Sequence, residues 1–553
     1  MFGKLNRQLT AFSILLMTAA LVAGVVACAD VTQSVQIRTW HDLDTVRGNL
    51  TSSYILMNDL DSATEGYEEL ASPTANGGKG WQPIGSWDAR FAGSFDGRGY
   101  EIRNLSINRP DERDVGLFSA VEQSGVIKNI GVTNATVIGQ DLVASLAGFN
   151  AGTVSNSYAS SSVTGSSYHV GGLLGGNEGT VTNSFSTGTV TGGSNIGGLM
   201  GTNAGYTSSS GSSSSVTGNG DLVGGLVGVN EGTVTDSYST GNVTGHLGVG
   251  GLVGVNGYSR LASVSNSHST GSVTGESYVG GLVGGNSYEG STVSDSYSTG
   301  SVAGDSYIGG LVGVNEGNAV TDSYSVCDVT GVDNVGGLVG GNQVDGVVSD
   351  SYFTGTVIGE SYVGGLVGSN QEGDVNNSYC TSNVTGDESV GGLVGFNFLR
   401  TVSVSYSTGN VTGKSYVGGL VGWNEEGEVN NSYSTGSASG SSSVGGLAGL
   451  NTGTINKSYS IGNVAGNTGV GGLVGENQMY GAVNSSFWDT ETSGQATSAG
   501  GTGKNTTQMK DIATFSDVAW NITAVSDPGA RNSSYIWNTV GGVTYPVLSW
   551  QAI

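Results

Sequence analysis

The sequence has few of the residues on which most enzymes and nucleic-acid-binding proteins depend. It contains 18 basic residues against 44 acidic ones and has a net charge of -26. This charge argues against binding to nucleic acid or to anionic lipid, because both require a basic surface that releases counterions. Of the 4 histidines, no two are spaced four apart with a glutamate between them, so the zinc-peptidase motif is absent.

Long hydrophobic runs are also missing, except at the start. Two basic residues precede a largely apolar run from Leu9 to Ala27, which predicts an export signal over residues 1–29. Two cleavage sites compete. The chain is cut either after Ala29, or before Cys28 in a sequence similar to a bacterial lipobox, which would make Cys28 a lipidation site. The predicted location is therefore extracellular, secreted or attached to the cell surface, with membrane contact only through a lipid on Cys28.

What the sequence has in excess is glycine, with 99 glycines against 5 prolines. The glycines recur in one phrase, seen most clearly from Val223 to Asn230, and a fixed period of this size indicates a repeat architecture. Successive copies lie 26 to 30 residues apart, as shown by the leucine of each phrase: Leu117, Leu146, Leu173, Leu199, Leu226, Leu252, Leu282, Leu311, Leu338, Leu366, Leu393, Leu420, Leu447 and Leu473.

Each repeat predicts one coil of a β-solenoid. Between phrases, the chain shows short β-prone runs separated by glycine turns, and about 27 residues suffice for a coil of three short strands. We therefore predict an all-β, parallel β-helix, right-handed by the general chirality of β-crossovers. The array covers residues 116–487, preceded by less regular capping coils over 36–115 and followed by a capping segment over 488–553. A short helix capped by threonine is expected at Thr506–Ile512.

Two columns of residues recur at fixed places in the coil, and both favour structural ladders. Asparagine tolerates left-handed turns and its amides can bond along a stack, and regular aromatic columns most often serve packing. The asparagine ladder includes Asn177, Asn230, Asn315, Asn370 and Asn424, and the aromatic ladder includes Tyr238, Tyr297, Tyr352, Tyr406 and Tyr433.

Two details test the stacking. In a straight strand, Val223 and Val227 would point to one face and Leu226 to the opposite face. Either the paired glycines therefore bend the chain, or one set of these side chains is partly exposed. Cys327 and Cys380 lie two repeats apart, a separation of roughly 10 Å at 4.8 Å per coil, which predicts two free thiols.

These residues resemble a known repeat family. The phrase G-G-L-V-G-x-N followed by runs such as Val234–Gly241 is similar to the GLUG-motif repeat, found in bacterial and archaeal surface proteins, adhesin-like proteins and regions of immunoglobulin A metalloproteases. The resemblance covers about residues 116–487. It implies a secreted or cell-surface β-solenoid and carries over no catalytic residue.

The function predicted from the sequence is a non-enzymatic scaffold for adhesion, interaction or envelope structure, with an unidentified protein or carbohydrate as its partner. No cofactor or metal is predicted; Asp59 and Asp61 lack the spacing of a calcium loop. Between Leu146 and Asn477 the array has only four basic residues, Arg260, Arg400, Lys414 and Lys457, against 23 acidic ones, which disfavours a site for anionic polysaccharide. An alternative stays open. A carbohydrate-binding or hydrolytic site that uses two carboxylates could lie on the N-terminal lead-in or among the C-terminal tryptophans.

Overall fold

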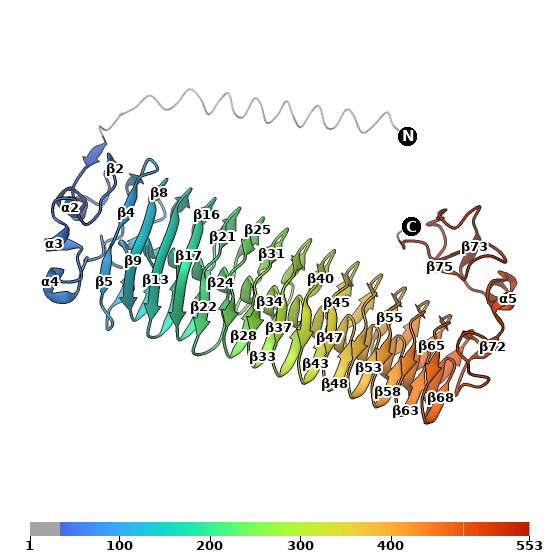
Figure 1. The fold of residues 1–553 in the computed structure, drawn as a ribbon. Helices are drawn as coiled ribbons and strands as arrows, with labels where there is room; N and C mark the ends of the chain where they lie inside the picture. The colour runs from blue at the N-terminus through green and yellow to red at the C-terminus, as the bar shows by residue number, and fades with distance from the viewer. Residues whose placement is uncertain (1–33, 479, 552–553) are drawn as a thin grey trace, which may run out of the picture.

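The computed structural model describes residues 34–478 and 480–551. The predicted export signal and Cys28 lie outside this range. The described chain forms a long stack of β-coils from the N-terminal end to residue 489, and a smaller C-terminal segment lies beside the last coils (Figure 1). In the described part of the chain, helices are few and short, and none is long and apolar enough to cross a membrane.

One coil illustrates the array. Strand β23 (Val223–Gly224) is followed by β24 (Val227–Asn230), β25 (Thr233–Thr235), β26 (Tyr238–Ser239) and β27 (Val243–Thr244) before the next phrase begins. Every strand pairs in parallel with the matching strand of the next coil, as when Val227 and Asn230 align with Val253 and Asn256 of β29 (Val253–Asn256). The fold is therefore a parallel β-solenoid.

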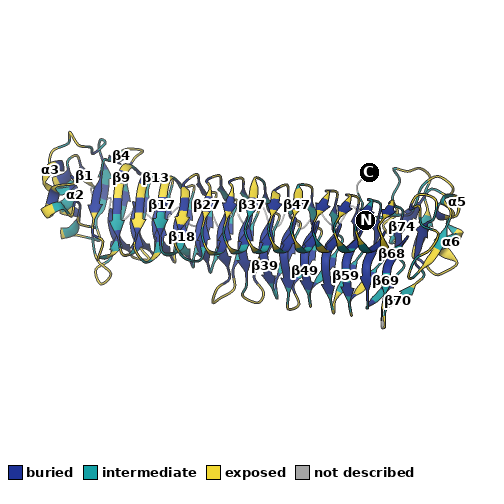
Figure 2. Cartoon of the chain, turned by 60° about the horizontal axis from the view of Figure 1, so that its bottom comes forward, coloured by how far each residue is buried: buried dark blue, intermediate teal, exposed yellow. Residues whose placement is uncertain are grey.

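Stacking creates four sheets that run along the molecule. Sheet A starts at β1 (Val35–Ile37) and ends at β70 (Ala482–Asn484). Sheet B contains both β26 and β27 and their counterparts. Sheet C runs from β7 (Phe118–Val121) to β69 (Val474–Asn477), and sheet D from β6 (Arg113–Val115) to β68 (Thr468–Gly471). Sheets C and D have 14 strands each, which gives fourteen coils. Buried residues fill the inside of the stack, whereas exposed residues gather at its turns and ends (Figure 2).

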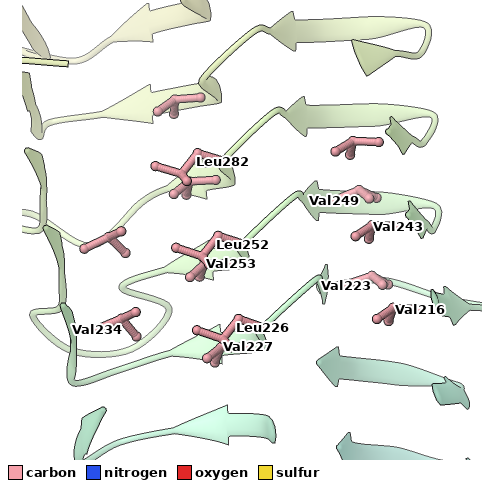
Figure 3. Packing of buried hydrophobic residues seen from close by; sticks show 14 of the residues in the cluster. Val216, Val223, Leu226, Val227, Val234, Val243, Val249, Leu252, Val253 and Leu282 are labelled. Atoms are coloured by element: carbon pink, nitrogen blue, oxygen red, sulfur yellow. The ribbon is translucent and has the colours of Figure 1, made fainter. Parts of the chain in front are cut away.

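The coil has four sheets where the sequence predicted three runs, and the glycine pair is the reason. A Cβ atom on Gly224 would lie 2.0 Å from the carbonyl oxygen of Val227, and one on Gly225 would lie 2.1 Å from that of Gly251. Only glycine fits this corner, which splits the phrase between sheets D and C. Val223, Leu226 and Val227 consequently all point into the core and are fully buried (Figure 3). The bend therefore accounts for the parity conflict.

The lead-in adds irregular coils to the same stack. Strands β1, β2 (Ser53–Leu56) and β3 (Ser94–Asp96) extend sheet A, while β4 (Glu101–Arg103) and β5 (Ser106–Asn108) pair with β9 (Gly131–Gly139) of sheet B. Between them lie four short helical segments that the sequence did not predict: α2 (Trp40–Asp44), η1 (Thr45–Gly48), α3 (Tyr67–Leu70) and α4 (Ala75–Gly78). Their large apolar side chains, such as Trp40 and Tyr67, join the same core.

The C-terminal segment covers the last coil and then folds back. Strand β72 (Thr502–Lys504) pairs with β71 (Phe487–Asp489), and after helices α5 (Thr506–Met509) and α6 (Ala513–Ser516) comes a three-stranded sheet of β73 (Ile522–Ala524), β74 (Trp537–Thr539) and β75 (Val547–Leu548). The cap of α5 is Asn505, which forms a reciprocal capping box with Gln508, so the prediction of a threonine cap was wrong by one residue.

Both described cysteines are free and buried, as predicted. Cys380 lies in a strand of sheet B and Cys327 in the turn just before one, and burial raises the pKa of the Cys380 thiol to about 12. A thiol that stays protonated and out of contact with water is a poor nucleophile. The two cysteines are packing residues in this fold.

Candidate binding surface on the outer elbow

The asparagine column forms an unbroken chain of amide hydrogen bonds inside the stack. Each side-chain Nδ2 donates to Oδ1 of the asparagine one coil further on, at 2.7–2.9 Å, from Asn150 to Asn477. Asn230, Asn315, Asn370 and Asn424 are fully buried and Asn177 nearly so. The amides are bonded to one another along the whole column, so the column stabilises the fold.

The aromatic column forms a second ladder on the outside of sheet B. From His268 to Tyr459, neighbouring rings lie 4.8–5.1 Å apart with interplanar angles of at most 10°, and this run includes Tyr297, Tyr352, Tyr406 and Tyr433. Tyr238 stacks on His268 at 5.7 Å. Because each ring face is covered by the next ring, at most the edges and hydroxyl groups reach solvent, and the stacked run offers no ring face to a sugar.

The C-terminal tryptophans pack on the last rungs of this ladder. Trp537 lies 5.9 Å from Tyr433 and 5.8 Å from Tyr459, Trp520 lies 6.2 Å from Phe487, and Trp550 lies 5.8 Å from Tyr406. Their indole N–H groups are also engaged, since Trp550 donates to the Val404 carbonyl and Trp520 to that of Ser485. These tryptophans thus attach the C-terminal segment to the stack.

A third pair of columns lies outside the core, where sheets D and C meet. One residue of every sheet-D strand, or the residue just before it, has a left-handed backbone with φ between 50° and 67°: Asp114, Leu142, His169, Asn195, Leu222, Gly248, Tyr278, Tyr307, Asn334, Tyr362, Ser389, Tyr416, Ser443 and Gly469. The facing column on sheet C contains Phe149, Gly176, Thr202, Val229, Val255, Gly285, Val314, Gly341, Ser369, Phe396, Trp423, Leu450 and Glu476. We call this two-column surface the outer elbow.

The two columns pack against each other outside the solenoid. Tyr362 lies 5.2 Å from Phe396, and Tyr416 lies 5.9 Å from Trp423. A Cβ atom on Gly341 would lie 2.7 Å from the Tyr307 ring, so that ring rests on a glycine. Unlike the rings of the ladder, those of the elbow are tilted by 39–57° to one another in the pairs Tyr278–Tyr307, Tyr362–Phe396, Phe396–Trp423 and Tyr416–Trp423.

The N-terminal end of the elbow is a hollow with mixed aromatic and polar walls. Trp87, from the lead-in, is 46% exposed and lies 5.0 Å from Phe149. The Arg90 guanidinium sits over both rings, 4.2 Å from the Trp87 centroid. The remaining walls include Arg113, Leu142, His169, Glu178, Thr202, Glu231 and Arg260. The hollow therefore combines an exposed ring with several hydrogen-bonding groups.

A hydrogen-bond chain fixes the polar wall. His169 Nδ1 donates to Asp141 Oδ1 at 2.8 Å, Arg113 pairs with the other oxygen at 2.9 Å, and Asn195 donates to His169 Nε2 at 3.3 Å. Burial would raise the pKa of Asp141, but the bond from His169 and the neighbouring positive charges outweigh it and lower that pKa. Burial, with a contribution from Asp141, raises the pKa of Asp114, whose Oδ1 has no partner. A ligand rich in hydroxyl groups fits this set of donors and acceptors.

No group of three or more histidine, cysteine, aspartate or glutamate side chains in the described ranges could hold a metal ion. Asp59, one of the two acids considered for calcium, instead pairs with Arg103 at 3.0 Å. His246 bridges Asp221 and Glu276 at 3.0 and 2.8 Å on an exposed turn. These contacts are ordinary ion pairs between coils.

Comparison with known proteins agrees with the repeat architecture. The family described as "The GLUG motif" matches six segments, 166–191, 219–244, 245–274, 275–303, 331–358 and 413–439. The chain therefore contains GLUG-motif repeats. Each matched segment spans about one coil of the solenoid.

Two relatives match part of this chain. Halomucin of Haloquadratum walsbyi is 37% identical over 130 residues, which cover 23% of this chain and 1% of halomucin. A protein of Evansella cellulosilytica, whose name describes a Gly-rich membrane protein, is 37% identical over 125 residues, or 22% of this chain and 14% of its own length. The chain thus spans a small part of the curated relatives that it matches.

Among solved structures, one chain aligns over 94% of both proteins. It is from Bacteroides ovatus and is titled as an immunoglobulin A1 protease, with 13% identity and a TM-score of 0.20. This score is too low to support any argument about fold or function.

Sequence reasoning missed the outer elbow and a serine ladder. In the serine ladder, the backbone N–H of one serine donates to Oγ of the serine one coil further on, as from Ser296 to Ser323 and from Ser323 to Ser351. The recurring Ser-Tyr pair was a signal for the serine ladder. The outer elbow had no comparable signal in the sequence, because its left-handed positions carry tyrosine, histidine, leucine, asparagine, aspartate and serine as well as glycine.

Proposed function

We propose that this GLUG-repeat protein is exported and acts at the cell surface as a non-enzymatic scaffold for adhesion or interaction. The observation that carries the proposal is the uninterrupted stack, in which every coil bonds to the next through four sheets. Fourteen coils at about 4.8 Å each span on the order of 65 Å. Such a stack holds its outer surface rigidly at a distance from an anchor, which suits display and contact.

Two further observations support a surface role. The N-terminal residues resemble an export signal, and one relative bears a name that describes a membrane protein. The acidic composition suits a solvated extracellular surface, and it opposes nonspecific binding to nucleic acid.

Export and anchoring can be tested in the producing cell. A tag placed in the exposed turn at Tyr258–Leu261 should be labelled by antibody on intact cells, whereas a cytoplasmic control should not. Replacing Cys28 with serine separates the two cleavage sites. Loss from the membrane fraction supports lipidation, whereas an unchanged distribution supports cleavage after Ala29. A tag that is reached only after lysis would refute export.

A second candidate function is carbohydrate binding at the N-terminal hollow of the elbow, favoured by the exposed Trp87 beside the Asp141–His169 chain. The C-terminal tryptophans are less suited, because they pack on the ladder and Trp537 is fully buried. A glycan array probed with residues 30–553 tests this function. Saturable binding that disappears in Trp87→Ala but persists in Tyr288→Ala, a variant of an equally exposed ring elsewhere, supports it. Glycan binding that persists in Trp87→Ala would contradict this function.

A further inference from the structure

The outer elbow between Tyr307 and Ser443 has a period of two coils. Backbone pairing places these residues at the same position of six successive coils, and tyrosine alternates there with a small polar residue: Tyr307, Asn334, Tyr362, Ser389, Tyr416 and Ser443. Alternate coils are about 10 Å apart along the stack. This is close to the repeat of two sugar rings in an extended β-1,4-linked glycan.

The tyrosines of this stretch are presented differently from those of the ladder. All three are half-buried and do not stack face to face on one another, because a small residue separates each from the next. The ring of Tyr362 is tilted 40° to that of Phe396, and the ring of Tyr416 is tilted 39° to that of Trp423. Aromatic side chains of this kind bind the apolar face of a sugar, while their hydroxyl groups remain free to bond.

Polar atoms without partners occur between these rings. Asn334 Oδ1 and Ser389 Oγ are buried and unbonded, in residues that are 4% and 0% exposed, and the indole nitrogen of Trp423 is also unbonded. A buried donor or acceptor without a partner is unfavourable, and native structures hold few of them. Nine other such atoms occur in the described chain, but these three lie among the rings of the elbow, where the hydroxyl groups of a ligand would supply their partners.

The negative charge around the rings disfavours an anionic ligand. Carboxylates of Asp333, Glu388 and Glu425 are close enough to Tyr362 to contribute to its raised pKa, after burial as the main cause. The two basic residues of this stretch already have acidic partners, because Lys414 bonds to Asp387 and Arg400 to Asp345. An anionic polysaccharide would meet net repulsion here.

We propose that the outer elbow from Tyr307 to Ser443 binds an extended, uncharged β-1,4-linked glycan lying along the solenoid axis, with one disaccharide for every two coils. Tyr307, Tyr362 and Tyr416 contact alternate sugars, and Asn334 and Ser389 bond to hydroxyl groups between them. The proposal goes beyond the scaffold role, which needs no particular ligand. It also differs in position from the hollow at Trp87.

The test uses residues 30–553 and cellohexaose, with maltohexaose as a curved control and polygalacturonate oligomers as an anionic control. Calorimetry should show saturable binding of cellohexaose, with affinity that rises stepwise with each added disaccharide, and little binding of either control. Tyr362→Ala and Tyr416→Ala should each weaken binding roughly fivefold to tenfold. Tyr258→Ala, which removes a 65% exposed ring outside the elbow, should leave it unchanged.

Two further variants separate binding from folding. Tyr362→Phe keeps the ring and should retain most of the affinity, and Asn334→Ala should weaken binding while circular dichroism stays unchanged. Absence of cellohexaose binding, or binding equally strong in Tyr362→Ala and Tyr416→Ala, would overturn the proposal. Binding that depends on Trp87 but not on Tyr362 would also overturn it, and would place recognition in the N-terminal hollow.

Discussion

The asparagine ladder gives the strongest quantitative prediction, at Asn315 in the middle of the array. Its Oδ1 accepts from Asn286 at 2.8 Å, and its Nδ2 donates to Asn342 at 2.9 Å and to the Asn318 carbonyl at 2.8 Å. Asn315→Ala leaves the Asn286 amide and the Asn342 oxygen without their partners, and both residues are fully buried. At about 1–3 kcal/mol for each unpaired buried group, the expected loss of stability is about 2–6 kcal/mol.

The loss should be local, because each coil of a solenoid is bonded only to its neighbours. Hydrogen exchange followed by mass spectrometry should show faster exchange in the strands around Asn286, Asn315 and Asn342, and slow exchange further away. Asn219→Ala is the matched control, since Asn219 is exposed and its loss should change stability by less than about 0.5 kcal/mol. Equal exchange in the two variants would show that the amide chain contributes nothing measurable, and would refute this estimate.

Asn315→Asp tests the direction of the same hydrogen bonds. An ionised carboxylate keeps the shape of the amide but cannot donate to Asn342. Burial would raise the pKa of this aspartate above its unfolded value near 3.9, so its folded form favours the proton. The stability of this variant should therefore fall as the pH rises through that range, whereas the parent chain should show no such change.

Three other predictions concern the corner and the C-terminal segment. Gly225→Ala should destabilise the array by several kcal/mol, because the added Cβ would lie 2.1 Å from the Gly251 carbonyl oxygen. Gly541→Ala is the control, since no atom lies within 4 Å of its Cβ, and it should leave the melting temperature unchanged. Similar melting temperatures for both variants would contradict the steric argument. Trp537→Ala should release the C-terminal segment from the ladder, so that trypsin cuts after Lys504 and Lys510 much faster than in the parent chain. Unchanged cleavage would mean that the other tryptophans alone hold the segment in place. Burial and the hydrogen bond to Asp489 raise the pKa of Tyr545 to about 12. The C-terminal segment should therefore stay fully attached to the stack below pH 10 and detach as the pH rises toward 12, as followed by tryptophan fluorescence. Fluorescence that does not change with pH would argue against burial of the Tyr545 hydroxyl.

The coil and its inward ladders could be predicted from the sequence because each depends on one residue type at one position. Leu226 and Asn230 recur wherever the core or the amide chain needs them, and the spacing of the leucines fixed the coil length. The number of sheets could not be predicted in the same way. It depends on how closely the Gly224–Gly225 corner approaches the next coil, and a glycine in a sequence does not reveal which atoms will face it.

The outer elbow could not be predicted from the sequence, for a related reason. Its left-handed positions are held by pairing on both sides, so the backbone conformation at Tyr307 or Ser389 is imposed by the neighbouring coils and not by a glycine. The C-terminal segment was predicted to cover the last coil, but not to extend back along the ladder as far as Tyr379. Contacts such as that between Trp550 and Val404 join residues 146 positions apart and leave no local pattern.

The unequal repeat length has a consequence for how such a chain can change. Leu252 and Leu282 are 30 residues apart and Leu199 and Leu226 are 27 apart, yet both steps keep every ladder in register. Much of the surplus is taken up in the turn between sheets C and A, where Tyr258 and Leu261 project into solvent. Duplication or loss of a whole coil would therefore alter the reach of the molecule by about 4.8 Å and preserve its surface pattern. The number of coils and the length and sequence of each turn can therefore change independently, while the interior remains the same.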